Sequence, residues 1–396
     1  MKIQSLVLFV FIFQTVSFAN KKIELYNPNE LAIKDAPVVI ELDKLSKIKK
    51  EKRSELAVFI DGKQISSQLD DLNEDGIPDE LFFLLDFTAN EKRSVTIKTV
   101  KSCKQDVFPT EVYANLILKE QDGSMKYISS ISSEKNDMYN KLHHHGIAFE
   151  SELMAYRIYF DNKSTIDVYG KKKKQLEIAT TGWYPTDEQL KAGFGDDILR
   201  VSGSVGVGTV KAWDGNKAIH INKFDKRTQR IVSKGNLRTI SESIVEGWEY
   251  EGKKINMTVR YIQHARHRDV TAEITASEDI ENLATGVQKI VNGPLFSDDR
   301  GLVGSWGSDY PQNDTIKYTK ETVGLGVYVP LQHVKKHTTD KINNLVLMPY
   351  KKNETLRFHL TTVWTKEKFG SIKDEKQFFD YLKSWSNTLN PIVVSF

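Results

Sequence analysis

The chain has 396 residues, of which 39% are hydrophobic and 28% are charged, so it can bury a sizeable core and is not globally disordered. With 56 Lys and Arg residues against 53 Asp and Glu residues, the formal charge of +3 is close to balance. This argues against a dedicated nucleic-acid-binding protein, which would concentrate basic residues on one face. The single cysteine, Cys103, excludes an internal disulfide framework and a cysteine-rich zinc site.

The first 19 residues predict a secretory signal peptide. Lys2 precedes a short apolar core at residues 6–13, and Ser17-Phe18-Ala19 fits a small-residue cleavage site. No other stretch is apolar for long enough to span a bilayer. We therefore expect an exported protein without a membrane span, periplasmic if the source is a Gram-negative bacterium.

Residues 20–103 predict a small N-terminal β-sandwich domain of immunoglobulin-like character. Several short apolar or alternating runs are separated by turn signals, among them Asn27-Pro28-Asn29 and Asp61-Gly62. About 80 residues in several such strands are typical of a sandwich of this kind.

An acidic segment inside this domain resembles a calcium-binding loop. Oxygen-bearing side chains at alternate positions can wrap a hard cation, and the candidate metal ligands are Asp71, Asn73, Asp75 and Asp79. Gly76 permits the sharp turn, but the twelfth position is Phe82, where such loops carry a bidentate Glu. An acidic hairpin turn that binds no ion is the alternative, and a bound Ca²⁺ would have a structural role.

Residues 104–396 predict a large antiparallel β domain, because many short strands follow one another with few helices between them. Thr186 and Gln189 form a capping box for a short helix that ends near Gly193. The only convincing longer helix covers residues 373–385, with Ser371 as its predicted cap. The basic run at residues 171–174 is interpreted as a solvated hairpin turn.

Three consecutive histidines stand at the entrance of a predicted strand that covers residues 147–160. In an extended segment alternate side chains share a face, so His143 and His145 would lie together, with His144 opposite. Two histidines on one side could bind a divalent metal, or one histidine could act as a general base. A polar loop packed against a sheet edge is the alternative.

The predicted strand after the histidines carries two sets of polar side chains. Glu150, Glu152 and Tyr156 would share one face and suit acid–base chemistry. Arg157 lies on the other face, where its planar guanidinium could hold a carboxylate through two hydrogen bonds. A cross-strand ion pair is the alternative for Arg157.

A second cluster, at residues 260–269, is rich in imidazole and guanidinium groups. On a strand, His264 and Arg268 would point to one side and His267 to the other. Such a cluster suits an anionic ligand, and a solvated edge is the alternative. Aromatic side chains beside glycine and proline turns favour sugar binding by ring stacking, with core packing as the alternative, at Trp183, Tyr184 and Trp306.

The motifs of this chain resemble a bacterial family known as domain of unknown function 4861, over nearly the whole chain after the signal peptide. The motifs are D-x-N-x-D-G-x-x-D-E, HHHG-x-A-x-E-x-E-L-x-A-Y-R-x-Y-F-D, I-D-x-Y-G-K, W-Y-P-T, G-x-G-D-D-I-L and H-R-D. The resemblance implies a galactose-mutarotase-like supersandwich for the large domain. It also implies an oligosaccharide dehydratase that acts on the non-reducing-end uronic acid in ulvan breakdown.

Such a dehydratase removes the proton at C5 of the uronate and expels the C4 hydroxyl as water, which leaves a 4,5-unsaturated uronate. The carboxylate must first be neutralised, by Arg157, by Arg268 or by a metal held by the histidines. The candidate bases are His144, His145 and Tyr156. The candidate acids are His264, His267 and Tyr184.

Two other functions remain open at this point. A glycoside hydrolase would use two carboxylates, for which Glu150 and Glu152 qualify if they lie about 7 Å apart on one strand face. A non-catalytic glycan-binding protein would use Trp183, Tyr184 and Trp306 as a platform. All three hypotheses share an acidic oligosaccharide as partner, and the sequence does not determine the oligomeric state.

Overall fold

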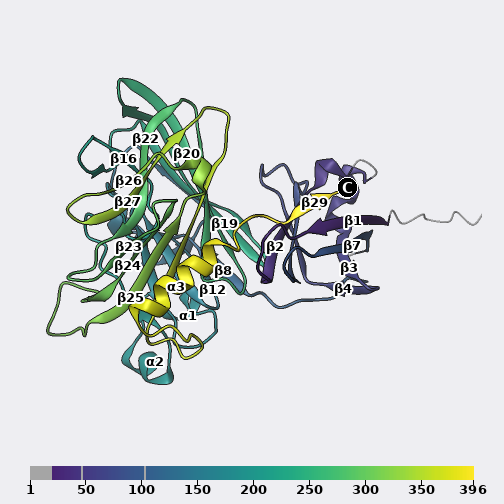
Figure 1. The fold of residues 1–396 in the computed structure, drawn as a ribbon, viewed down its shortest axis with the longest axis horizontal. Coiled ribbons are helices and arrows are strands. Elements are labelled where there is room, and N and C mark those ends of the chain that lie inside the picture. Colours follow the sequence, from purple (N-terminus) through teal and green to yellow (C-terminus); the bar gives the residue numbers. More distant parts are fainter. Residues whose placement is uncertain (1–19, 46–47, 102–103) are drawn as a thin grey trace, which may run out of the picture.

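The computed structural model describes residues 20–45, 48–101 and 104–396 of the chain (Figure 1). The predicted signal peptide and Cys103 lie outside these residues. Nearly all of the regular structure is antiparallel β, arranged as a small sandwich beside a much larger one, so the predicted mostly-β fold class is confirmed. Among the residues that the structure describes, no helix has the length and apolar character needed to cross a membrane.

The small sandwich has two sheets that enclose a core of alternating apolar side chains, including Ile23, Val38, Val58 and Leu81. One sheet has the order β29 (Val393–Ser395), β1 (Lys21–Tyr26), β7 (Lys92–Thr99), β3 (Leu56–Ile60) and β4 (Lys63–Ile65). The other sheet consists of β2 (Ile33–Glu41), β6 (Glu80–Phe87) and β5 (Ser67–Asp70).

The C-terminal strand corrects the predicted domain boundary, which had placed everything after residue 103 in the large domain. The chain crosses back from the large domain, and β29 pairs with β1 in antiparallel register, with Leu25 opposite Val394 (Figure 1). Ile392 is buried in the core of the small sandwich. The C-terminal segment therefore belongs to the small sandwich, because it pairs with the edge of β1 and adds the Ile392 side chain to the core.

The large domain is built on a nine-stranded antiparallel sheet. Its order is β11 (Ser130–Ser133), β18 (Lys226–Lys234), β19 (Arg238–Tyr250), β20 (Lys253–His264), β21 (Val270–Ala276), β28 (Leu356–Trp364), β25 (Glu321–Tyr328), β24 (Leu302–Asp309) and β23 (Leu295–Ser297).

Two five-stranded sheets cover this large sheet and share its core. The first has the order β15 (Asp196–Asp197), β14 (Ile166–Gly170), β13 (Met154–Tyr159), β12 (Gly146–Ser151) and β8 (Val112–Asn115). The second has the order β17 (Ala218–Ile219), β16 (Lys211–Trp213), β22 (Ile280–Gln288), β27 (Asn343–Tyr350) and β26 (Lys336–Thr339). A separate ribbon pairs β10 (Met125–Tyr127) with β9 (Ile117–Lys119).

Helices are few and short. The α-helices are α1 (Ile178–Thr181), α2 (Asp187–Ala192) and α3 (Glu375–Ser386), and the 3-10 turns are η1 (Leu42–Lys44), η2 (Lys50–Glu55), η4 (Tyr139–Lys141) and η5 (Leu331–His333). The predicted capping box of α2 is confirmed, since Thr186 and Gln189 each bond the other's backbone amide. The predicted cap of the long helix was wrong, because Asp374, not Ser371, accepts from Gln377 N.

Helix α3 packs on strands β24 and β25, where glycines replace bulkier side chains (Figure 1). A Cβ at Gly326 would lie 2.3 Å from the Leu382 side chain, and one at Gly324 would lie 2.7 Å from Phe378. These glycines let the helix approach the sheet closely, and Phe378, Leu382 and Trp385 fill the contact.

The two domains meet through a polar and an apolar contact. Arg238 of β19 is buried, and its guanidinium bonds Asp70 at 2.6 Å and Glu80 at 2.5 Å in the small sandwich. Phe82 of β6 packs in a cluster with Leu237 of the large domain. Because both charged groups and apolar side chains are buried between the two domains, this contact contributes to the stability of the folded protein.

The predicted long strand over residues 147–160 was wrong. The segment forms a hairpin of β12 and β13, with Phe149 opposite Tyr156 and a turn at Glu152 and Leu153. The Ser151 hydroxyl accepts a hydrogen bond from Leu153 N in this turn. Glu152 and Leu153 are not residues typical of tight turns, and no Gly, Pro, Asn or Asp stands beside them, so the sequence does not mark the turn.

Candidate active site

A polar cleft of about 680 Å³ lies beside β13, β14 and β15 of the first five-stranded sheet. Arg157 and Tyr159 are two residues apart on β13 and therefore share a face. Asp167 of β14 lies directly opposite Arg157 in the strand register. Asp197 comes from β15, the next strand, and loops supply the opposite wall. These three strands and several loops thus bring together residues that are far apart in sequence.

Arg157 is the hub of the cleft and is almost fully buried, at 2% exposure. Its Nη2 donates to Asp167 at 2.6 Å, to Tyr159 Oη at 2.8 Å and to Asp197 at 3.1 Å. Its Nη1 donates to Tyr184 Oη at 2.8 Å. Behind it, the guanidinium lies 4.5 Å from the centre of a Trp183 ring. These contacts fix the cation and hold two phenols and two carboxyl groups around it.

His145 stands at the end of the histidine run in the left-handed backbone region, with φ of 63°. Its ring stacks on Tyr139 with the centroids 3.5 Å apart. Nδ1 lies 2.8 Å from the Tyr139 carbonyl oxygen, which can only accept a hydrogen bond. Nδ1 therefore carries the hydrogen, and Nε2 is left as an acceptor. Burial lowers the pKa of His145 to about 4, so the ring is neutral at physiological pH.

Tyr184 joins His145 to Arg157. Its hydroxyl lies 2.9 Å from His145 Nε2, to which it donates, while it accepts from Arg157. Burial raises the pKa of Tyr184, and the positive charge of Arg157 opposes that rise. The residue is nevertheless 45% exposed, so a molecule in the cleft can reach it. The phenol thus has a proton acceptor on one side and a stabilising cation on the other.

Asp197 is the second titratable group of interest. One of its oxygens, Oδ2, accepts from Arg157 and from Gln312 Nε2 at 2.8 Å. The other, Oδ1, is buried without a hydrogen-bond partner among the described residues. Burial, and then the negative charge of Asp167, raise the pKa of Asp197 well above its usual value. Asp197 is therefore easier to protonate than an ordinary aspartate, and Oδ1 is the oxygen without a hydrogen-bond partner among the described residues.

The rim of the cleft carries positive charge. Arg200 lies on it with its side chain 35% exposed, bonding Asp309 at 3.2 Å. Lys163 and Lys289 also line the cleft. These cations suit a negatively charged ligand above the buried group of acids and phenols.

Among the residues predicted for a site, His145, Arg157 and Tyr184 line this cleft. Trp183 does not line it: its ring is buried under Arg157. His144 is also fully buried, between His143 and Trp183, and neither of its ring nitrogens has a partner among the described residues. The turn at His145 separates the three rings, so they do not share one site.

Tyr156 and the second cluster are corrected as site residues. Tyr156 is buried in the core and donates to the Arg268 carbonyl oxygen at 2.5 Å. The side chain of Arg268 is itself bound to both oxygens of Glu367. Since the hairpin turns β13 back on β12, Tyr156 faces the large sheet and not the cleft.

The histidines of the second cluster lie at the contact between the two domains. His264 stacks on Phe82 of the small sandwich at 5.1 Å. His267 Nε2 lies 2.7 Å from the Asp35 carbonyl oxygen, and its Nδ1 lies 3.2 Å from Asp269. These residues connect the domains and do not line the cleft.

Two further expectations are corrected. Trp306 is buried against Phe378 of α3, so it offers no sugar platform. Glu150 is fully buried in an ion pair with Lys171, while Glu152 accepts from Arg266 N on an exposed turn. The two glutamates therefore do not form a hydrolytic pair. Lys171 itself is fully buried and is not part of a solvated turn.

The acidic loop at residues 71–79 is held by its own hydrogen bonds. Asp71 accepts from Gly76 N at 2.7 Å, and Asp79 accepts from Leu72 N at 2.8 Å. Asn73 accepts from Asp75 N at 2.9 Å. Within residues 20–45, 48–101 and 104–396, no three His, Cys, Asp or Glu side chains group as metal ligands. Ca²⁺ in this loop and a divalent metal at the histidines stay predictions.

Sequence reasoning missed five residues of the hydrogen-bonded group in this cleft. Tyr159 lies in the histidine motif without a signal of its own, and Tyr139 and Gln312 carry no signal either. Asp167 and Asp197 lie in the motifs I-D-x-Y-G-K and G-x-G-D-D-I-L, so the sequence marked them without giving a role.

Comparisons with known proteins identify the family of this chain. A family model described as "Domain of unknown function (DUF4861)" matches residues 25–394. No curated protein sequence matches the chain. Similar solved structures include an alpha-mannosidase from Enterococcus faecalis V583, with 9% identity and a TM-score of 0.45 over 95% of this chain and 46% of that chain. A glycosyl hydrolase family 38 protein from Enterococcus faecalis has 9% identity and a TM-score of 0.42 over 94% and 47%. The chain thus spans about half the length of each structure.

Proposed function

This chain belongs to the family of domain of unknown function 4861, and we propose that it is a carbohydrate-active dehydratase. It eliminates water from the non-reducing-end uronic acid of acidic oligosaccharides, such as those from ulvan, and leaves a 4,5-unsaturated uronate. The contacts of Tyr184 carry the proposal: its hydroxyl lies between His145 Nε2 at 2.9 Å and Arg157 Nη1 at 2.8 Å.

The first requirement of the reaction is a more acidic proton at C5. The carboxylate attached to C5 withdraws electrons poorly while it is negatively charged, so a neighbouring cation must balance that charge. Arg157 already directs its donors to Asp167, Asp197 and the phenols, so we assign the carboxylate to the rim, with Arg200 as the main contact. Arg157 then acts on the proton carriers and not on the substrate carboxylate.

The second requirement is a base. We assign it to Tyr184 together with His145. As Tyr184 takes the C5 proton, its own proton passes to His145 Nε2, and Arg157 stabilises the phenolate character that develops. The neutral state of His145, with Nδ1–H bound to the Tyr139 carbonyl, is the state that can accept this proton.

The third requirement is an acid, because hydroxide is a poor leaving group. Asp197 in its protonated form gives its proton to the C4 oxygen as the C4–O bond breaks. The electron pair of the C5–H bond forms the C4–C5 double bond, and water leaves. The enzyme then holds one proton more on His145 and one fewer on Asp197, and exchange with solvent restores both.

The test follows the purified protein with uronate-terminated oligosaccharides from ulvan, by ultraviolet absorbance and mass spectrometry together. A rise in absorbance with the loss of one water from the intact oligosaccharide is the expected result. Shorter products without a double bond would instead indicate a glycoside hydrolase, for which Asp167 and Asp197 are the carboxyl pair, since both contact Arg157 Nη2. Unchanged masses together with measurable binding would indicate a glycan-binding protein.

A further inference from the structure

A second pocket of about 670 Å³ lies next to the cleft. It is formed by β17, by the end of β19 and by the hairpin between β26 and β27. The two hollows share a wall: Ile342 lines both, and Gly203 lines the pocket while its neighbours Ser202 and Ser204 line the cleft. A chain-like ligand in the cleft can therefore continue over this wall into the pocket.

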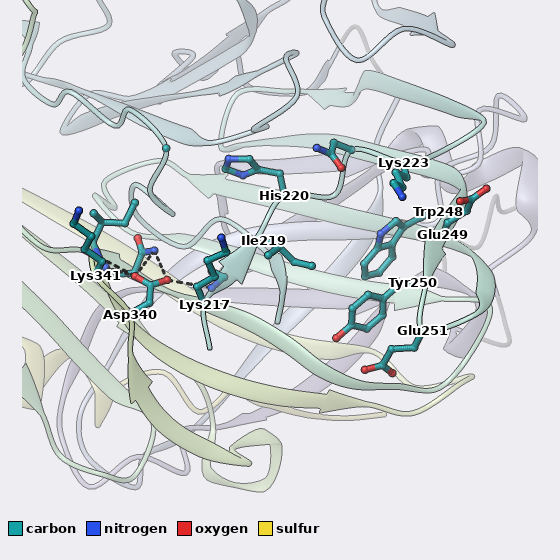
Figure 2. A pocket seen from close by; sticks show the side chains of 15 residues that line it. Lys217, Ile219, His220, Lys223, Trp248, Glu249, Tyr250, Glu251, Asp340 and Lys341 are labelled. Atoms are coloured by element: carbon teal, nitrogen blue, oxygen red, sulfur yellow. Dashed lines mark hydrogen bonds between the residues drawn. The ribbon is translucent and has the colours of Figure 1, made fainter. Parts of the chain in front are cut away.

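Three lysines line the pocket, together with the carboxylates of Glu249, Glu251 and Asp340. Lys217, Lys223 and Lys341 are exposed, and none of their ammonium groups makes a salt bridge within the described chain. Figure 2 shows Lys217 and Lys341 at the same end of the pocket as Asp340. The Asp340 carboxylate, however, accepts from the backbone amides of Ala218, Ile342 and Asn343, so it is already engaged.

His220 adds a neutral donor to the pocket. Its Nδ1 lies 3.1 Å from the Nζ of the buried Lys211, and an ammonium group donates hydrogen bonds but cannot accept them. Nδ1 therefore accepts, and Nε2 carries the hydrogen and can donate to a ligand.

The other end of the pocket is aromatic. The rings of Trp248 and Tyr250 stack with centroids 4.9 Å apart and an angle of 15° between their planes (Figure 2). The Tyr250 hydroxyl donates to the Trp213 carbonyl oxygen at 2.8 Å, which fixes the ring. Glu249 and Glu251 line the pocket beside the rings. Trp248 is buried and supports Tyr250 from behind, so the partly exposed Tyr250 ring is the face that a sugar can contact. The neighbouring carboxylates can accept hydrogens from the sugar hydroxyl groups.

We infer that this pocket binds the sugars beyond the terminal uronate of an oligosaccharide, and that Lys217 and Lys341 recognise an anionic substituent on them. The inference rests on the proposed function in placing the terminal uronate in the cleft. The anionic group is a carboxylate or a sulfate ester, both of which pair with ammonium groups.

The test compares a uronate-terminated disaccharide with a hexasaccharide, both prepared from ulvan. The variant is Lys217→Gln with Lys341→Gln, and the matched control is Lys22→Gln with Lys126→Gln, two exposed lysines outside both hollows that lose the same charge. We expect the ratio of hexasaccharide to disaccharide kcat/KM to fall about tenfold in the first variant and not in the control. An unchanged ratio in both would overturn the inference.

A binding measurement separates this inference from the proposed reaction. Calorimetric titration of the hexasaccharide needs no turnover. The wild-type protein could bind the hexasaccharide without dehydrating any substrate, while the Lys217→Gln, Lys341→Gln variant binds it about tenfold more weakly. That result would support the binding pocket and contradict the proposed reaction. If the wild type and the variant bind the hexasaccharide equally well, the inference about the pocket is wrong. Removal of sulfate esters from the probe weakens binding only if sulfate is the recognised group; unchanged binding assigns the carboxylate.

Discussion

At the scale of single residues, the cleft depends on how buried charges are shared around Arg157. A guanidinium that is 2% exposed needs acceptors on all sides, and it finds two carboxyl groups and two phenols. Burial, and then the negative charge of the neighbouring Asp167, raise the pKa of Asp197 above the ordinary value for an aspartate. Arg157 opposes this rise but holds the carboxyl groups and phenols together, so that proton carriers of different kinds meet in one cleft.

Tyr184→Phe removes the hydroxyl that joins His145 to Arg157. We expect the dehydration rate to fall by roughly 10²–10⁴-fold, the usual loss when a general acid or base is removed. The fold should be retained, because Tyr184 is 45% exposed. The matched control is Tyr127→Phe on the exposed ribbon, which should turn over normally. Full turnover by Tyr184→Phe with an intact circular dichroism spectrum would exclude this tyrosine from the mechanism.

The pH profile tests the neutral state of His145. The ring must be unprotonated to accept a proton, and burial lowers its pKa to about 4. Activity should therefore persist as the pH falls through 6.5, the ordinary value for histidine, and decline only near pH 4. The measurement is kcat/KM from pH 3.5 to 8, with far-ultraviolet circular dichroism at each point. A decline centred on pH 6.5 would contradict this assignment.

At the scale of elements, the hairpin of β12 and β13 decides which predicted residues reach the cleft. Its turn places Arg157 and Tyr159 in the cleft and sends Tyr156 into the core. The same turn places Glu150 against Lys171, where the carboxylate also accepts from the amides of Glu177 and Ile178. This buried pair holds the start of α1, and with it the loop that carries Tyr184, against the sheet.

Lys171→Met tests that buried pair. Removing one member leaves the Glu150 carboxylate buried without its cation, which typically costs about 3–5 kcal/mol of unfolding free energy. Lys174→Met, three residues away on an exposed turn, should change the same quantity by less than about 0.5 kcal/mol. Urea denaturation of both variants gives the comparison. Equal midpoints would show that the pair contributes no net stability.

At the scale of the whole molecule, the histidine cluster proves to be part of the contact between domains. His267 spans it, from Asp269 in the large domain to the Asp35 carbonyl oxygen in the small one. Burial alone would lower the pKa of His267, but Asp269 and the contact with Asp35 raise it to about 9. The protonated ring therefore stabilises the folded assembly.

The stability that the charge on His267 contributes depends on pH, in a direction set by its raised pKa. Because the folded pKa is raised above about 6.5, the stabilisation is fully present below pH 6.5 and is lost as the pH rises through 9. The unfolding free energy of the wild type should exceed that of His267→Gln by about 3 kcal/mol at pH 6. At pH 10 the difference in unfolding free energy should be smaller. Thermal unfolding of both proteins between pH 6 and 10 measures this. A difference that does not depend on pH would mean that the imidazolium charge is not involved.

The sequence predicted the fold class, most strands and three cleft residues, because these follow from local alternation and from residue type. His145, Arg157 and Tyr184 stand in motifs with obvious proton-carrying or cationic chemistry. Asp167 and Asp197 could not be assigned, because their role arises only when β13, β14 and β15 pair. His267 was misassigned for a similar reason, since its partner Asp35 lies 232 residues earlier.

The pairing of β29 with β1 has a consequence for how the protein comes into being. A ribosome makes β1 long before β29, with the whole large domain in between, so that edge of β1 has no partner while the large domain is being made. Exposed edges of this kind attract other strands. The small sandwich can thus be completed only after the large domain has been synthesised, and any process that acts on the nascent chain before then meets β1 with this edge still unpaired.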